Sequence, residues 1–350
     1  MISTPNSSGL RALNQLLDNP IMRRSLLCIT LFSVVSFQGA AAGNLADFKR
    51  PLAIPFDKVT PYSLQLATLG KMLFFDPRLS GAKNMNCASC HNPSFGFEVP
   101  VKTPVGAANT HLARQSPTIL NVAWTTPLFW DGRAPTLEAQ AAGPITAAAE
   151  MNGKLDQIVA DLRAIPDYNS WFKQIFPDKG ATNETLLTAI ATYERTVVSA
   201  WSPFDRWVDG DETAVSDSAK RGFELFTGKA NCAVCHTGWN FTDNKFHDTG
   251  LPTDDIGRAK FEPNNPKALY AFKTPSLRNT LYRGPYMHDG SLATMEDVIA
   301  HYESGGVKSA SRSDSISPFF ITDREREELI AFLKTLTPEQ QDLLLPTLPN

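Results

Sequence analysis

Apolar residues recur at helical spacing in three stretches of the chain, and each stretch predicts a helix. Two of them, residues 66–73 and 216–226, lie upstream of paired cysteines. The third begins at Thr322, which can form a capping box with Glu325, and carries its apolar stripe over residues 329–336. No stretch shows the sustained alternation that is typical of strands. The pattern therefore predicts a mainly α protein.

Two further stretches predict helices, the alanine-rich residues 136–150 and residues 293–301. The 25 prolines among 350 residues predict short helices joined by many loops. Because 42% of the residues are hydrophobic and 20% are charged, the chain has globular composition and is not disordered. The net charge of −3, without runs of like charge, argues against nucleic acid as a partner.

The N-terminus has the pattern of an export signal. The segment Met22-Arg23-Arg24, with two basic residues, precedes the uncharged residues 25–37 and the small residues 40–42. Since the apolar part is shorter than the ~20 residues of a membrane-spanning helix, a membrane anchor is the less favoured alternative. We expect residues 1–42 to be removed near Ala42. The mature chain would then lie in the periplasm without a membrane span.

The chain has five cysteines, and Cys28 falls inside the predicted signal. The other four form two C-x-x-C-H motifs, Cys87-Ala-Ser-Cys90-His91 and Cys232-Ala-Val-Cys235-His236. Such a motif attaches haem c, because its two thiols bond the vinyl groups and its histidine becomes an axial iron ligand. Disulfide bonds do not explain the histidines, and a zinc site would need both pairs to meet around one metal. We therefore predict two covalently bound haem c groups.

The two motifs begin at positions 87 and 232, which predicts one cytochrome c-like domain for each haem. We place the first domain in residues 43–207 and the second in residues 208–350. The expected junction is the stretch 201–211, which is rich in proline, glycine and acidic residues.

Several stretches around the haem motifs match a known family. They are LGKMLFFD (69–76), SPT (116–118), FWDGRA (129–134), PSLRN (275–279) and PYMHDG (285–290). Over residues 52–340 the chain resembles the bacterial di-haem cytochrome c peroxidase superfamily, and it looks closest to the MauG-like branch. The resemblance implies a peroxide-reacting haem in the first domain and an electron-transfer haem in the second.

The resemblance also bears on the far side of the first haem, opposite His91. Relatives can close this side with a histidine in a Gly-His-Gly-like segment, where this chain has Gly106-Ala107-Ala108. Ala107 cannot ligate iron, and we favour an exposed loop position for the nearby His111. We therefore predict a first haem that is five-coordinate or water-bound and open to peroxide.

By resemblance, the acid that moves a proton between the peroxide oxygens is Glu150, with Gln140 and Pro144 in the same pocket. The sequence pattern alone would not choose Glu150 over Glu138. Trp130 matches the aromatic residue between the haems and would relay electron holes. Simple core packing is the alternative for this tryptophan.

Opposite His236 at the second haem, the peroxidases place a methionine, and the equivalent position here is Tyr302. Tyrosine at this position is typical of the MauG-like branch. An anionic phenolate stabilises ferric iron and lowers its potential, so the second haem would share the oxidising equivalent. His301 is the chief alternative ligand, and the further candidates are His247, His288, Met287 and Met295.

Family members hold a calcium ion through an asparagine side chain and backbone carbonyls. Here Gln115 stands at the asparagine position, and the carbonyls of Arg283 and Pro285 would complete a calcium site. Gln115 still offers an oxygen, but its reach differs.

The favoured function is a peroxide-dependent di-haem oxidoreductase. It would form a high-valent di-haem state and oxidise an aromatic residue, by preference tryptophan, of a periplasmic partner protein. The alternative is a di-haem cytochrome c peroxidase that reduces hydrogen peroxide with electrons from a small cytochrome c or copper protein. A plain electron-transfer cytochrome is a third reading. Trp239, just after the second motif, is a candidate exit for electron holes.

Overall fold

The computed structural model describes residues 44–56, 61–339 and 343–350, so the predicted signal in residues 1–42 lies outside the described residues. The α-helices are α3 (Leu64–Phe74), α4 (Leu137–Thr146), α5 (Leu155–Ala164), α6 (Pro166–Ile175), α7 (Asn183–Thr196), α8 (Pro203–Val208), α9 (Asp217–Thr227), α10 (Met295–Ser304) and α11 (Asp323–Thr335). The 3-10 helices are η1 (Leu45–Phe48), η2 (Pro77–Leu79), η3 (Cys87–Ser89), η4 (Pro93–Phe95), η5 (Ala107–Asn109), η6 (Val122–Trp124), η7 (Cys232–Val234), η8 (Arg258–Lys260), η9 (Pro266–Ala268) and η10 (Thr280–Tyr282). The strands are β1 (Phe246–His247) and β2 (Phe272–Lys273), an antiparallel pair.

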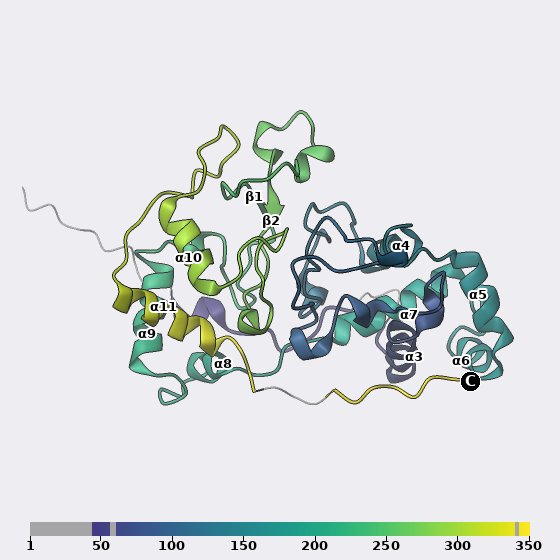
Figure 1. Ribbon diagram of the computed structural model, residues 1–350. Coiled ribbons are helices and arrows are strands. Elements are labelled where there is room, and N and C mark those ends of the chain that lie inside the picture. The colour runs from purple at the N-terminus through teal and green to yellow at the C-terminus, as the bar shows by residue number, and fades with distance from the viewer. Residues whose placement is uncertain (1–43, 57–60, 340–342) are drawn as a thin grey trace, which may run out of the picture. The chain divides into compact units, whose positions relative to one another are not determined.

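This architecture confirms the prediction of a mainly helical protein with short helices and many loops (Figure 1). The helices expected before the two cysteine motifs are α3 and α9, and the capping box of Thr322 and Glu325 starts α11. The helix predicted in residues 136–150 ends at Thr146, where the backbone of Ala147 becomes extended. The stretch 201–211, expected as a junction, contains helix α8.

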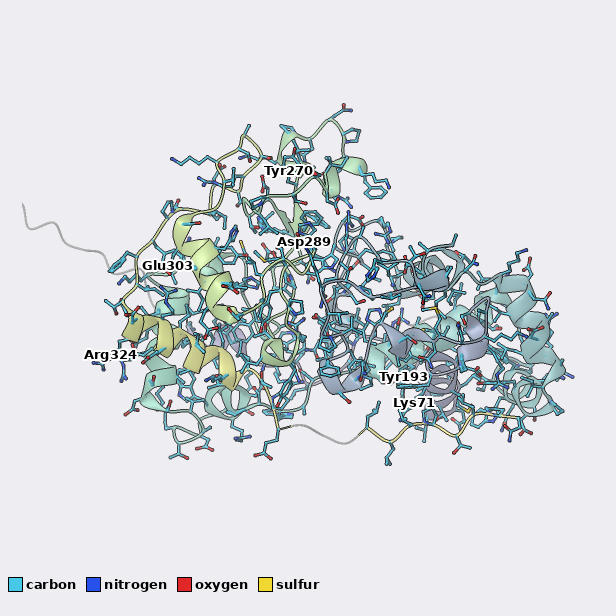
Figure 2. The ribbon with its side chains drawn as sticks, viewed as in Figure 1. Lys71, Tyr193, Tyr270, Asp289, Glu303 and Arg324 are labelled. Carbon is cyan, nitrogen blue, oxygen red and sulfur yellow. The ribbon has the colours of Figure 1, made fainter. Side chains whose placement is uncertain are left out.

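Two pairs of helices cross at glycines, one pair in each half of the chain. Gly70 of α3 faces α7, where an added Cβ would lie 1.9 Å from the Ala189 carbonyl oxygen. Gly222 of α9 faces α11, where a Cβ would lie 1.9 Å from the Glu328 carbonyl oxygen. In Figure 2 the labelled side chains Lys71 and Tyr193 mark the crossing of α3 with α7. These close approaches fix the helices that lead into the two cysteine motifs.

Buried apolar side chains form separate clusters around these crossings. Helices α3 to α7 enclose one cluster with Leu69 and Phe172, and a neighbouring cluster contains Phe74 and Val197. A third cluster is rich in phenylalanine and surrounds α9 and α11. Phe48 and Phe204 pack in this third cluster, although the predicted domain boundary at 207/208 groups them with the first domain. That boundary stays a prediction.

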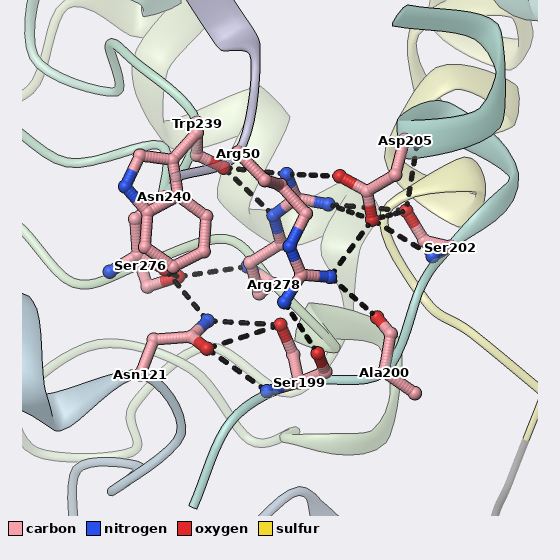
Figure 3. A network of polar contacts seen from close by, with 10 residues as sticks. All are labelled: Arg50, Asn121, Ser199, Ala200, Ser202, Asp205, Trp239, Asn240, Ser276 and Arg278. Atoms are coloured by element: carbon pink, nitrogen blue, oxygen red, sulfur yellow. Dashed lines mark hydrogen bonds and ion pairs between the residues drawn. The ribbon is translucent and has the colours of Figure 1, made fainter. Parts of the chain in front are cut away.

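A buried polar network ties the third cluster to the segment before α8 (Figure 3). Asp205 accepts hydrogen bonds from Ser202 and forms an ion pair with Arg278 at 2.8 Å. Both side chains of that pair are only 1% exposed. Arg50 adds a second contact to Asp205 at 3.3 Å and donates to the Ala200 carbonyl. The network therefore balances two buried guanidinium groups against one carboxylate.

The Asp205→Asn variant is expected to lose about 3–5 kcal/mol of unfolding free energy, because it leaves a buried guanidinium without its counter-charge. Urea denaturation of the holoprotein measures the change. Asp209→Asn is the matched control, since Asp209 pairs with Lys49 at an exposed site, where a salt bridge contributes about 0–1 kcal/mol. Equal losses in the two variants would contradict the account of this network.

Within the described part of the chain, no helix combines the length and the apolar character needed to cross a bilayer.

Candidate haem-binding sites

Each C-x-x-C-H motif folds in the same way. Its cysteines begin a one-turn 3-10 helix, η3 at Cys87 and η7 at Cys232, and the histidine follows that turn. Nδ1 of His91 lies 3.2 Å from the Phe97 carbonyl oxygen, and Nδ1 of His236 lies 3.0 Å from that of Phe241. Because the Nδ1 hydrogen is held by a carbonyl, Nε2 of each ring is left as the free lone pair that iron ligation needs. Burial also lowers the pKa of both histidines, which favours the neutral form.

The first cavity has a volume of about 900 Å³ and brings together most of the residues predicted around the first haem. Its lining includes Cys87, Cys90, His91, Trp130, Gln140, Pro144 and Glu150. Residues far apart in the sequence thus share one space, with two thiols and a neutral imidazole in the arrangement that haem c requires. The donor set fits the group.

Glu150 reaches this cavity because α4 ends early. After Thr146 the chain turns, and the Glu150 carbonyl accepts a hydrogen bond from the Ala107 N–H at 2.7 Å. Burial raises the pKa of Glu150, and the positive charge of Arg133 partly opposes that rise. The side chain therefore tends to keep a proton within a half-buried pocket.

Among the described residues that line the first cavity, His91 is the one histidine. His111 is exposed, and it pairs with Val105 in an isolated antiparallel bridge. Ala107 lies beside the turn that carries Glu150 and is not part of the lining. Among the described residues, the lining of the first cavity therefore provides a single imidazole, and the open first haem stays a prediction.

The second cavity, of about 320 Å³, is lined by Cys232, Cys235, His236 and Tyr302. Tyr302 projects from the same face of α10 as Met295, seven residues earlier, and both side chains line the cavity. Burial raises the pKa of Tyr302, so the phenol stays protonated unless a strong Lewis acid such as ferric iron binds its oxygen.

Three of the alternative ligands at the second haem already contact other groups of the protein. Nε2 of His301 lies 3.1 Å from the Thr249 carbonyl oxygen, and His301 is not part of the cavity lining. His247 lines the cavity but forms an ion pair with Asp243 at 2.8 Å. His288 also lines it and stacks on the ring of Phe272, with 3.6 Å between ring centroids. Met287 and Met295 line the cavity as well.

The residues of the predicted calcium site also line the second cavity, together with a carboxylate that already has a cationic partner. Gln115 donates from its amide nitrogen to Glu98 at 3.3 Å, and Arg283 pairs with the same carboxylate at 2.9 Å. Pro285 lines the cavity beside them. A calcium ion here would lie close to a guanidinium that already neutralises the local carboxylate.

Trp130 lines both cavities, and its indole N–H donates to the Gln115 carbonyl oxygen at 2.8 Å. Trp239 lines neither cavity and lies beside the guanidinium groups of Arg50 and Arg278, which are 5.5 Å and 5.9 Å from its ring centroid. Positive charge disfavours removal of an electron from an indole. These charges argue against Trp239 as an exit for electron holes.

Sequence reasoning missed Glu194, a fully enclosed acid in the wall of the first cavity. Glu194 is 4% exposed, its Oε2 has no hydrogen-bond partner among the described residues, and it lines the cavity together with Cys87. Burial raises the pKa of Glu194 to about 8. Helical spacing could have indicated that Glu194 is buried, because it follows the buried Ile190 by four residues on α7.

Comparisons with known proteins agree with these two sites. The sequence profile of the family described as "Di-haem cytochrome c peroxidase" matches residues 64–213, and the profile described as "Cytochrome c" matches residues 219–337. The methylamine utilization protein MauG of Methylorubrum extorquens is 46% identical over 93% of this chain and 96% of its own length. The cytochrome c551 peroxidase of Nitrosomonas europaea is 34% identical over 93% of this chain and 94% of its own length.

Among solved structures, one of a MauG-like protein associated with microbial copper homeostasis superimposes with a TM-score of 0.78. It is 33% identical to this chain and covers 83% of this chain and 95% of its own. Both sequence and fold therefore relate the chain to these proteins over most of its length.

Proposed function

Because the chain belongs to the di-haem cytochrome c peroxidase family, whose members carry two c-type haems and act on peroxide, we propose that it uses hydrogen peroxide to oxidise an aromatic residue, by preference tryptophan, of a partner protein. The observation that carries this proposal is Tyr302 in the wall of the second cavity, where the peroxidase relatives place a methionine. Greater identity to MauG, 46%, than to the cytochrome c551 peroxidase, 34%, supports the same branch.

The haems, when bound, supply the redox chemistry that splits the O–O bond. The residues of the chain provide the setting for that chemistry. His91 and His236 would each hold a haem iron through Nε2, because Nδ1 of each ring faces a backbone carbonyl oxygen. Glu150 accepts a proton from one peroxide oxygen and returns it to the other, which makes water a leaving group. Tyr302 would supply a hard oxygen ligand, which favours ferric over ferrous iron.

Gln140 and Pro144 complete the wall of the pocket near Glu150, and Trp130 bridges the walls of both cavities. In this proposal Trp130 relays electron holes, and the oxidising equivalents leave through the protein to the partner. A calcium ion at Gln115, Arg283 and Pro285 stays a prediction. Location in the periplasm is part of the proposal and is supported by the signal-like pattern of residues 22–42.

The test pairs the holoprotein with the product of the gene that neighbours its own, treats the pair with hydrogen peroxide, and maps added oxygen by peptide mass spectrometry. We expect modified tryptophan in the partner only when both peroxide and this protein are present. An unmodified partner together with rapid peroxide turnover by reduced cytochrome c would support the detoxifying peroxidase instead.

A further inference from the structure

Six residues line both cavities, and one of them is a cation. They are Gln115, Trp130, Lys273, Thr274, Pro275 and Ser276. Lys273 is the last residue of β2, and its backbone N–H donates to the Trp130 carbonyl oxygen at 2.8 Å. This bond fixes the lysine beside the tryptophan that lines both cavities.

The Lys273 ammonium group has a single polar partner among the described residues. Its Nζ donates to the Pro127 carbonyl oxygen at 2.9 Å, and no described carboxylate lies within ion-pair distance. Burial lowers the pKa of Lys273 to about 8, so the group keeps a positive charge at neutral pH despite its surroundings. One neutral carbonyl does not replace the water that a half-buried ammonium ion has lost.

Several other buried or half-buried cations have a negatively charged partner. Three guanidinium groups each have a carboxylate partner, Arg114 with Asp131 at 2.6 Å, Arg278 with Asp205 at 2.8 Å and Arg283 with Glu98 at 2.9 Å. Lys273 has no carboxylate partner among the described residues, and it lines both of the cavities that contain the C-x-x-C-H motifs. A bound molecule with an anionic group would provide Lys273 with a negatively charged partner.

We propose that the Lys273 ammonium pairs with a propionate of a bound haem at the wall shared by the two cavities. Each haem c carries two propionates, which supply the missing counter-charge. Lys273 is then a positioning residue that raises the reduction potential of that haem, because a nearby positive charge favours the state with the additional electron. This role holds whether the protein oxidises a partner or scavenges peroxide, since both functions need two haems.

The test measures the midpoint potentials of both haems by spectroelectrochemical titration of the holoprotein. Lys273→Gln keeps a hydrogen-bond donor, on a side chain one atom shorter, and removes the charge. We expect one haem to become harder to reduce by about tenfold in its equilibrium constant, or about 59 mV for one electron. Lys308→Gln, which removes a charge from an exposed site, should leave both potentials unchanged. Unchanged potentials in a fully haem-loaded Lys273→Gln protein would overturn the proposal.

A second variant is needed if the Lys273→Gln protein fails to bind haem. Lys273→Arg keeps the charge but replaces the compact ammonium group with a planar guanidinium group. Resonance Raman spectra of the holoprotein report the bending modes of the propionates. We expect the modes of one haem to shift in Lys273→Arg, whereas identical spectra would overturn the pairing. Neither readout depends on the substrate, so a failure here leaves the proposed function standing.

Discussion

Replacing Glu150 with glutamine is expected to slow the reaction with hydrogen peroxide by about 10²- to 10⁴-fold, the usual contribution of a general acid–base group. Glutamine keeps the shape of the side chain but cannot take a proton from one peroxide oxygen and pass it to the other. Stopped-flow absorbance of the haem-loaded protein measures the rate.

Glu138→Gln is the matched control for this prediction. Glu138 belongs to the same helical region, but it pairs with Arg195 at 3.0 Å and does not line the first cavity. The control should react at the wild-type rate. A Glu150→Gln protein that also reacts at the wild-type rate would remove this residue from the mechanism.

The Tyr302→Phe variant is expected to change the ferric spectrum of the second haem and to raise its reduction potential. Loss of an anionic oxygen ligand removes the preference for the oxidised iron, and each tenfold change in the equilibrium corresponds to about 59 mV. The peroxide-oxidised protein should then decay faster, because the second haem no longer shares the oxidising equivalent. Optical and electron paramagnetic resonance spectra of the ferric protein measure the first effect.

His301→Gln separates the two candidate ligands in the same experiment. His301 contacts the Thr249 carbonyl and lies outside the cavity lining, so its replacement should leave the ferric spectrum unchanged. A spectrum altered by His301→Gln and unaffected by Tyr302→Phe would contradict the assignment of the tyrosine.

The parts of this molecule that depend on short-range pattern could be predicted from the sequence. Helices α3, α9 and α11 follow from apolar spacing and from the Thr322 cap, and the haem motifs follow from cysteine and histidine spacing. Glu150 needed the family resemblance, because a chain turn after Thr146 brings it to the cavity. No local pattern distinguishes that turn from a continued helix.

Features that depend on contacts between distant parts of the chain could not be predicted from the sequence. Glu194 and Lys273 are ordinary charged residues in the sequence, and only the fold places them in the walls of the cavities. Phe48 packs with α8 and α9, about which its own short segment says nothing. The charges around Trp239 likewise come from Arg50 and Arg278, which are distant in sequence.

The most direct measurement mixes the fully ferric holoprotein, without any reductant, with one equivalent of hydrogen peroxide in a stopped-flow spectrometer. An open first iron beside Glu150 and a tyrosine-ligated second iron predict a prompt change in the absorbance of both haems and a slowly decaying oxidised protein. A spectrum that stays ferric until one electron has been added first would contradict the account.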